Sequence, residues 1–420
     1  QGRIDMACFA FPKYSWLDFL FTLFGVCTYL FDVGSDLWVA AEFCQRGHFF
    51  WSGLVLSFML TSSVIVQMFS WFWIKYDRDL ENFESETSEN NIVLGGPSHA
   101  KLTCFLHVCQ LGFFFRHVSA LRQGFCVWWR RGEGARYAVY LTHDLSMLRL
   151  FETFCESAPQ LTLMVHTMLR TGHARTIQCV SVVASTISVA WMVVDYHRSL
   201  RSYLPEKTRQ DWLSSVAYFL WNLLLIAPRV VSVALFTSVL PLYIVAHFLS
   251  LWFVFVLWAW LKGTCFMDSR AGEWLYRATI GVIWYFSWFS VSEGRTRWRS
   301  LIYHTFILVD NSILLLTWWW MRNPEMTQTY ALPLAVLVPL FYVTGLLVKA
   351  LYYHCCHPMR QGDLPDGLVY KSAVDQTSAV YSQTVNKRMA NHVTNFYSSK
   401  TTAVTKTNDS VISKLIGDWT

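Results

Sequence analysis

Ten long apolar segments constrain the fold of this chain more than any other feature of its sequence. They occupy residues 17–42, 49–74, 102–115, 137–169, 176–196, 213–240, 241–261, 273–291, 301–321 and 331–353, and the third continues as a basic amphipathic stretch to residue 131. A helix of about 20 apolar residues crosses the hydrocarbon of a bilayer, which is about 30 Å thick. Only 15% of the 420 residues are charged, whereas soluble domains contain about 25%. The sequence therefore predicts an all-α polytopic membrane protein.

Basic residues between the segments restrict how the chain crosses the membrane. They concentrate at 198–209, at 295–299 and in the tail, and the positive-inside rule places all three stretches on the cytoplasmic side. Ten full crossings cannot satisfy this requirement. Residues 102–131 are too basic in their second half to cross, and residues 213–240 are interrupted at Ala227-Pro228-Arg229, so each is expected to enter and leave on the same side. We predict eight spans, two re-entrant segments and cytoplasmic termini.

The distribution of apolar segments predicts an ordered membrane domain followed by a disordered tail. Residues 1–353 form the transmembrane domain, with possible halves at about 14–200 and 211–353, and residues 354–420 form a disordered cytoplasmic tail rich in Ser, Thr, Asn and Lys. The run from His354 to His357 could bind zinc, but four contiguous ligands rarely surround one ion. We therefore expect juxtamembrane packing or palmitoylation of Cys355 and Cys356 instead of a metal site.

Several functional classes lack their sequence features here. The net charge of +6 is spread over short loops, without the basic block that nucleic-acid binding uses. No phosphate-binding Gly-x-x-x-x-Gly-Lys-Ser/Thr loop, His-Glu-x-x-His or Gly-x-Ser-x-Gly motif is present. We expect no cofactor and no catalytic centre, and movement of any solute or lipid is expected to be passive or ion-coupled.

The first apolar segment carries three carboxylates on one face. At about 100° per residue Asp18, Asp32 and Asp36 share an azimuth within about 40° and span roughly 27 Å, close to the hydrocarbon thickness. Each carboxylate at mid-membrane costs about 2.5 to 3.5 kcal/mol on insertion scales. The stripe therefore indicates a polar path or an internal ion network. Alternatively, Asp18 lies at headgroup level while Asp32 and Asp36 pair with basic partners, and the two interpretations can coexist.

A second group of charges lies in the segment 137–169. Arg149, Glu152 and Glu156 are spaced i, i+3 and i+7, so they share a helix face. Their sum is one uncompensated negative charge, for which Arg229 is the predicted partner. The group either locks helices together or lines a path. Further charges at or near membrane depth are Arg116, Asp144, Asp195 and Asp310.

The tail contains a pattern typical of caspase cleavage sites, Asp363-Leu-Pro-Asp366-Gly367. Proteases need extended, accessible backbone, which an unfolded tail supplies. Cleavage after Asp366 would release residues 367–420, whose net charge of +3 could hold the fragment on an anionic inner leaflet.

Several stretches of this sequence resemble the XK-related family, and within it the branch of caspase-activated phospholipid scramblases. The matching stretches are Phe31-Asp-Val-Gly-Ser-Asp-Leu-Trp38, Asp144 to Leu161, Asp195-Tyr196, Tyr218 to Leu225, Pro228-Arg229, Glu273 to Arg277, Tyr285 to Phe289 and Glu293 to Arg297. The resemblance implies eight spans in two pseudo-symmetric halves with re-entrant helices. It also implies that an executioner caspase cuts the tail during apoptosis and that phosphatidylserine then reaches the outer leaflet of the plasma membrane. A single-span immunoglobulin-type partner similar to basigin or neuroplastin is expected.

Together these observations predict an ATP-independent phospholipid scramblase. Headgroups would pass Asp18, Asp32 and Asp36 while the acyl chains stay in lipid. Trp51, just beyond the first loop, is a candidate gate, although an aromatic-belt role suits the same ring. Two alternatives stay open, namely a transporter or channel for small polar solutes and a scaffold for a lipid-transfer protein.

Overall fold

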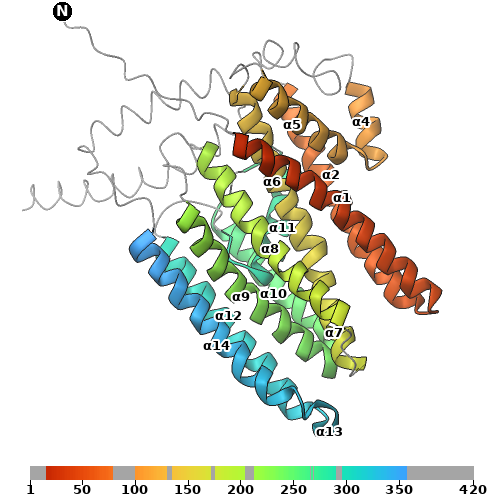
Figure 1. The fold of residues 1–420 in the computed structure, drawn as a ribbon, viewed down its shortest axis with the longest axis vertical. Helices are drawn as coiled ribbons and strands as arrows, with labels where there is room; N and C mark the ends of the chain where they lie inside the picture. The colour runs from red at the N-terminus through yellow and green to blue at the C-terminus, as the bar shows by residue number, and fades with distance from the viewer. Residues whose placement is uncertain are drawn as a thin grey trace, which may run out of the picture.

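The structure is a computed structural model that describes residues 16–78, 100–129, 135–171, 176–203, 212–264, 266–267, 269–289 and 296–356. This part of the chain is helical and contains no strand, which confirms the predicted all-α fold (Figure 1). The helices are α1 (Trp16–Gln45), α2 (Phe49–Arg78), α4 (Ala100–Val108), α5 (Gly112–Trp129), α6 (Ala135–Glu152), α7 (Ala158–Thr171), α8 (Thr176–Tyr203), α9 (Trp212–Val239), α10 (Tyr243–Leu261), α11 (Arg270–Phe286), α12 (Thr296–Met321), α13 (Pro324–Thr327) and α14 (Ala331–Leu351), with π-helical turns η2 (Thr153–Ser157) and η3 (Tyr352–Cys356).

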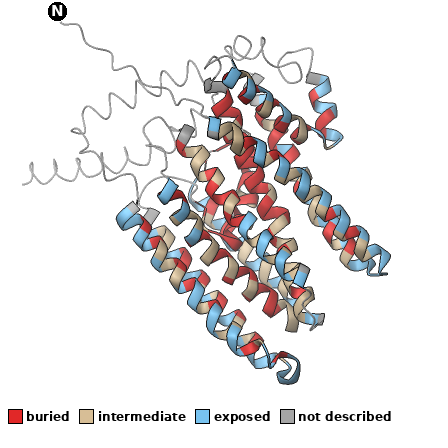
Figure 2. Ribbon diagram, viewed as in Figure 1, coloured by how far each residue is buried: buried red, intermediate tan, exposed pale blue. Residues whose placement is uncertain are grey.

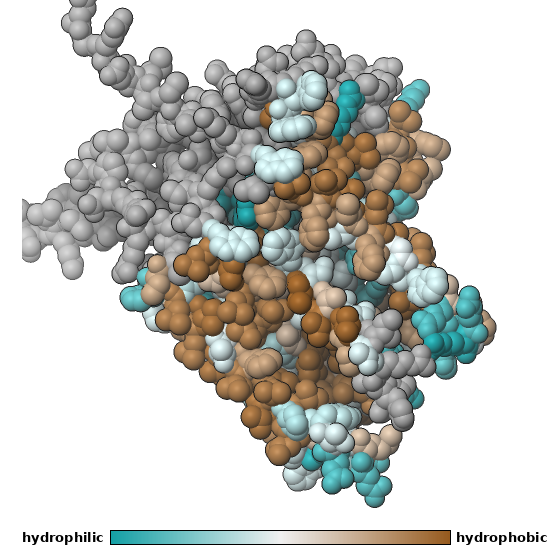
Figure 3. Space-filling view, viewed as in Figure 1, coloured by the Kyte–Doolittle hydropathy of each residue, from teal (hydrophilic) through white to brown (hydrophobic). Residues whose placement is uncertain are grey.

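In the described part of the chain, eight elements are long enough to cross a bilayer. Among the described residues, α1, α2, α8, α9, α10, α12 and α14 are also apolar enough to do so. The eighth is the continuous rod formed by α6, η2 and α7, whose mean hydropathy is lowered by its own charged residues. Large apolar side chains cover the outside of this bundle, and Figure 3 shows them as a broad brown face. Such a surface is what lipid-facing helices require.

The segment α4–α5 is the first re-entrant element. The two helices meet at an angle of 118° across a short break, where Gln110 takes a positive φ of 63°. The middle of α2 holds this tip. Ser63 Oγ donates to Gln110 Oε1 over 2.6 Å, and Gln67 Nε2 donates to the Gln110 carbonyl over 2.9 Å. Because Ser63 and Gln67 lie halfway along α2, the tip lies at mid-membrane depth, as predicted for residues 102–131.

The second re-entrant element is α11, and the prediction that residues 213–240 form it is wrong. Helix α9 continues through Pro228 over 28 residues, whereas α11 has only 17 and at 1.5 Å per residue falls short of the hydrocarbon thickness. The carbonyl of Tyr285 near the end of α11 accepts a hydrogen bond from Arg229 Nε at 2.9 Å. Arg229 lies in the middle of α9, so α11 stops inside the bundle, and the prediction of a full span at 273–291 is also wrong.

Helix α9 remains straight enough to cross because the surrounding helices pack against it. It contacts α7, α8, α12 and α14, and Figure 2 shows that buried residues concentrate along these central helices. Gly345 of α14 permits the closest approach, since a Cβ there would lie 2.9 Å from Leu225 Cδ2 of α9. Packing of this kind offsets the roughly 3 kcal/mol that an interior proline costs a helix.

Helices α1 and α2 form an antiparallel hairpin at the edge of the bundle. Near their turn, Ser52 Oγ of α2 donates to the Ala40 carbonyl of α1 over 2.8 Å. In Figure 1 the hairpin diverges from α7 and α8 toward this turn. One face of α1 is turned toward the rest of the bundle. The opposite face carries Phe31, which is 77% exposed, and Trp38, which is 74% exposed, and it faces lipid.

Candidate functional site along the first helix

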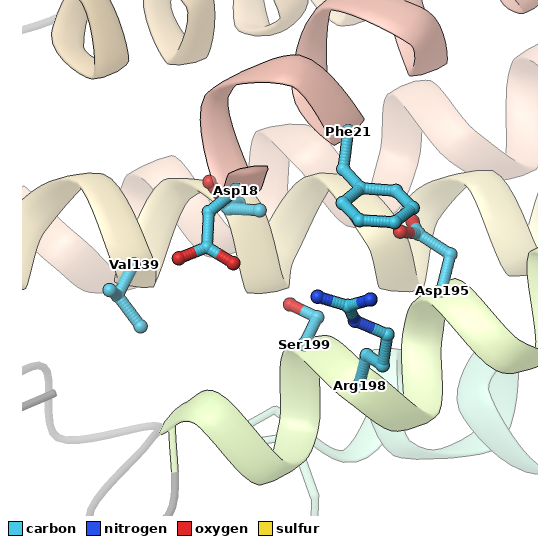
Figure 4. A pocket seen from close by; sticks show the side chains of 7 residues that line it. Asp18, Phe21, Val139, Asp195, Arg198 and Ser199 are labelled. Carbon is cyan, nitrogen blue, oxygen red and sulfur yellow. The ribbon is translucent and has the colours of Figure 1, made fainter. Parts of the chain in front are cut away.

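The first carboxylate of the stripe, Asp18, lines a small cavity at one end of the bundle. The cavity is about 30 Å³, which admits about one water, and it is lined by Asp18, Phe21, Val139, Thr142, Asp195, Arg198 and Ser199. In the view of Figure 4 the guanidinium of Arg198 lies between the carboxyl groups of Asp18 and Asp195. Arg198 also lies over the ring of Phe21, 4.2 Å from its centroid. Helices α1 and α8 thus bring opposite charges together at this end, and α6 completes the wall of the cavity.

Arg149 of α6 connects α6 to the middle of α1. Its Nη1 donates to the Gly25 carbonyl and, over 2.9 Å, to Thr28 Oγ1. Gly25 makes this approach possible, because a Cβ there would lie 3.1 Å from the same Nη1. The guanidinium is buried, with Arg149 6% exposed. A cation is therefore fixed between two spans at the centre of the stripe.

The next carboxylate, Asp32, lies beside this cation. Its Oδ2 accepts a hydrogen bond from Ser157 Oγ at 3.2 Å, and Arg149 is its principal electrostatic partner. Glu152 belongs to the same group, since Arg149 and Asp32 are among its charged neighbours. Asp32, Arg149 and Glu152 are therefore electrostatic neighbours here, and Ser157, for which the sequence pattern gave no indication, binds Asp32.

A π-helical turn brings the last residues of this group to face α1. The N–H of Ala158 donates to the Thr153 carbonyl, five residues back, instead of the usual four. Proline has no N–H, and its ring clashes with the carbonyl four residues before it. The wider turn directly before Pro159 accommodates this clash, and such turns occur frequently at functional sites. Glu156 within the turn lies next to Asp36 of α1.

A larger cavity continues the line at the α1–α2 turn. It has a volume of about 240 Å³ and is lined by Asp36, Val39, Phe43, Arg46, His48, Val55, Gln160, Leu163, Met164, Thr167 and Gln178. Trp51 of α2 packs beside it against His166 of α7, with ring centroids 5.7 Å apart. Asp36 is 8% exposed, and Glu156 and Gln160 are the hydrogen-bonding neighbours of its carboxyl group.

These polar contacts follow one another along α1, and we call them the polar track. It begins at the Asp18 cavity, passes Arg149 and the Asp32–Glu156 group, and ends in the larger cavity beyond Asp36. One side is α1, and the other is built by α6, η2, α7 and α8. The predicted residues Asp18, Asp32, Asp36, Arg149, Glu152 and Glu156 thus lie along one side of α1, Trp51 lies beside the larger cavity, and their role as a lipid path stays a prediction. Sequence reasoning missed Thr28, Ser157 and Gln160, because neutral polar residues are common in any membrane helix.

Arg229 does not belong to this track, and its predicted pairing with Glu152 and Glu156 is wrong. Its side chain is fully buried and forms an ion pair with Asp310 of α12. Nη1 also donates to Asn311 Oδ1 over 2.8 Å, and His247 Nε2 lies 3.1 Å from Asp310. The glutamates have Arg149 as a neighbouring cation, whereas α9 presents Arg229 to α11 and α12. The Arg229–Asp310 pair and the Arg149 group thus lie in different helix interfaces.

Asp363, Asp366 and Gly367 lie outside the described residues. Cys355 in η3 is a free, exposed cysteine. Within the described ranges no group of His, Cys, Asp and Glu is placed to hold a metal ion.

Fold and track together define a polytopic helical membrane protein with ionisable side chains enclosed between a lipid-facing hairpin and the rest of its bundle. The family model described as XK-related protein matches residues 20–358, and the chain belongs to the XK-related family. It is 57% identical to XK-related protein 8 of Gasterosteus aculeatus over 401 residues, which cover 93% of this chain and 99% of that protein. The XK-related protein 8 of Tetraodon nigroviridis is 57% identical over 93% of this chain and 98% of its own length, and that of Pan troglodytes is 38% identical over 90% and 94%.

Proposed function

We propose that this protein is an ATP-independent phospholipid scramblase. The observation that carries the proposal is the polar track, which lies along a hairpin whose opposite face is apolar. Moving a zwitterionic or anionic headgroup through hydrocarbon is strongly unfavourable because it strips the headgroup of polar contacts. A side-chain track spanning the bundle replaces those contacts stepwise while the acyl chains remain in lipid. Such transport needs no catalytic centre and no cofactor.

The charges along the track suit this task because both signs occur along it, with Arg198 and Arg149 as cations and Asp18, Asp32 and Asp36 as carboxylates. A headgroup would leave Arg198 and Asp18, pass Arg149 beside Asp32, and reach Asp36 before the wide cavity. Ammonium groups interact with the carboxylates and phosphates with the guanidinium groups. No single position therefore has to bind the whole headgroup tightly, which favours movement over trapping. Trp51 lies beside the wide cavity, where a gate would act.

We further propose that the protein acts at the plasma membrane with both termini in the cytoplasm. An executioner caspase would cut after Asp366 during apoptosis, and the cleaved protein would expose phosphatidylserine at the cell surface. The sequence Asp363-Leu-Pro-Asp366-Gly367 and the likeness to XK-related protein 8 support this regulation. A single-span immunoglobulin-type protein similar to basigin or neuroplastin is the proposed escort to the surface.

Reconstitution in liposomes tests the scramblase proposal directly. We expect the full chain, after caspase cleavage, to move a tail-labelled fluorescent phospholipid between leaflets without ATP. Asp32→Asn should slow this movement, whereas Glu325→Gln, which removes an exposed carboxylate outside the track, should not. If the folded, cleaved protein leaves the lipid in place but passes ions or amino acids, the protein is a transporter.

Surface phosphatidylserine in cells tests the proposed activation. Cells expressing the intact chain should expose phosphatidylserine only after an apoptotic stimulus, and cells expressing Asp366→Ala should not expose it. A chain ending at Asp366 should expose it without a stimulus. Exposure by Asp366→Ala equal to that of the intact chain would refute cleavage at this site, and absence of exposure in every case would favour the scaffold alternative.

A further inference from the structure

Two adjacent cysteines, Cys355 and Cys356, end the last span of the bundle. They belong to η3, which continues α14 without a break. The apolar span from Ala331 to Cys355 has 25 residues, about 37 Å at 1.5 Å per residue, so it is longer than the roughly 30 Å of hydrocarbon in a bilayer. The cysteine pair therefore lies where the chain leaves the hydrocarbon.

Neighbouring helices place η3 at the edge of the membrane. Ser214, in the first turn of α9, donates a hydrogen bond to the Tyr352 hydroxyl over 3.4 Å. Trp212 begins α9 and Trp298 lies near the start of α12, and both side chains are exposed. Exposed tryptophans concentrate at the boundary between hydrocarbon and water. In Figure 1 the blue end of α14 lies at the same end of the bundle as the starts of α9 and α12, so Cys355 lies at this boundary.

The side chain of Cys355 is accessible from the lipid. It is a free, exposed cysteine, and at a spacing of four residues it continues the exposed face that Leu347 and Leu351 form on α14. The other side of this segment is buried against α9, where Lys349 lies over a tryptophan ring and Tyr352 packs against a tyrosine. A hydrocarbon chain attached to Cys355 would therefore enter the lipid beside α14 without displacing a helix.

This end of the bundle also carries the basic stretches of the sequence. Helix α8 ends at Tyr203, within the basic stretch 198–209, and α12 begins at Thr296, within 295–299. The positive-inside rule assigns such an end to the cytoplasm, the compartment that contains long-chain acyl-CoA. Cysteines next to a membrane span on that side are typical acceptors of fatty acids.

We propose that Cys355 is a site of reversible S-acylation by a long-chain fatty acid, and that the acyl chain holds η3 and the start of the tail on the inner leaflet. The Cys355 sulfur attacks the carbonyl carbon of an acyl-CoA thioester. A new C–S bond forms as the bond to the CoA sulfur breaks, and CoA leaves with the proton of the Cys355 thiol. Neither partner is oxidised or reduced. The site rests on the proposed cytoplasmic placement of the C-terminus and does not depend on lipid movement.

Metabolic labelling of the full chain in cells with an alkyne-bearing palmitate tests this site. We expect label on the purified protein that neutral hydroxylamine removes, because hydroxylamine cleaves thioesters and leaves amides intact. Cys355→Ser should lose most of this label, whereas Cys356→Ser should keep most of it. Cys44→Ser and Cys179→Ser serve as controls and should keep all of it, since both residues are exposed but lie near the opposite end of the bundle.

Two outcomes of the labelling would overturn the proposal. One is a full chain without hydroxylamine-sensitive label in cells where another acylated protein is labelled. The other is a folded Cys355→Ser variant that keeps its label. A chain that carries the label on Cys355 but moves no lipid in liposomes would refute only the scramblase proposal.

A membrane-impermeant maleimide separates the site from the topology on which it rests. In intact cells it should not modify Cys355, and after permeabilisation it should do so only once hydroxylamine has removed the acyl chain. Modification of Cys355 in intact cells would refute the cytoplasmic placement and the site with it. Equal modification of permeabilised cells with and without hydroxylamine would leave the placement standing and refute the S-acylation.

Hydrogen exchange in nanodiscs measures the anchoring role. Removal of the acyl chain by hydroxylamine should raise the exchange rate of the amides of residues 353–356 several-fold and leave the rate in the middle of α9 unchanged. Cys355→Ser, which has no chain to lose, should show the higher rate with and without hydroxylamine. Equal rates at residues 353–356 in the acylated and deacylated protein would refute the anchoring of η3.

Discussion

Replacing Arg229 with methionine should destabilise the protein by about 3 kcal/mol or more. Methionine retains much of the side-chain volume, so the variant isolates the loss of charge and of hydrogen bonds. Asp310 would lose its ion pair and keep only His247, 3.1 Å away, and the Tyr285 carbonyl and Asn311 would lose their donors. Breaking a buried ion pair on one side costs about 3 to 5 kcal/mol, whereas neutral hydrogen bonds between membrane helices average about 0.6 kcal/mol. Because Asp310 would be left without its cation, we expect a loss of stability closer to the 3 to 5 kcal/mol of a broken ion pair.

The measurement is the Tm and the folded yield of the purified protein in detergent. A loss of about 3 kcal/mol lowers the Tm of a 150–250-residue domain by about 6 to 12 °C, and this larger bundle by roughly 5 °C or more. The exposed Lys262→Ala on the turn after α10 serves as the control and should leave the Tm unchanged. The double variant Arg229→Met with Asp310→Leu should be more stable than Arg229→Met alone, because no charge is left unpaired. An unchanged Tm in Arg229→Met, or strictly additive effects in the double variant, would refute the reasoning.

Three further outcomes follow from single contacts. Gly345→Leu should lower the stability of the protein by about 1 to 3 kcal/mol and reduce its Tm, because a Cβ at this position would lie 2.9 Å from Leu225 of α9. The control Gly53→Leu, where a Cβ has nothing within 4 Å, should leave the Tm unchanged. Gly25→Val should slow lipid movement in liposomes while the protein still folds, because the new side chain displaces Arg149 from the α1 backbone; an unchanged rate would show that this contact does not shape the track. Gln67→Leu should destabilise the α4–α5 tip by about 1 to 3 kcal/mol, detected as faster hydrogen exchange there, because it leaves backbone groups of that tip unpaired.

The two re-entrant elements show what loop charges and helix breakers can predict. Residues 102–131 are basic in their second half, and the structure bends the chain there by 118°. The second prediction relied on Pro228, whose effect was outweighed by the packing of α9 against four other helices. The shortness of α11 was a better indication. Its C-terminal boundary at Phe286 lies within an apolar run and is set by contacts such as that of Tyr285 with Arg229.

For the candidate site too, some features follow from the sequence and others only from the packing of the helices. The one-sided placement of Asp18, Asp32 and Asp36 follows from their spacing alone, and so does the shared face of Arg149 and Glu152. The choice of partner does not, since Arg229 could meet any acid that the helix packing brings near it, and it meets Asp310.

By itself the sequence determined the helical membrane class, the stripe of carboxylates and the position of one re-entrant segment. Hydropathy and the 3.6-residue period act over neighbours in the chain, so they need no knowledge of distant residues. Tertiary structure decided the length of α9, the π-turn geometry that faces Glu156 toward α1, the partner of Arg229 and the cavity beyond Asp36. Each of these depends on which helices lie side by side, and burial energies summed over whole helix faces determine that arrangement.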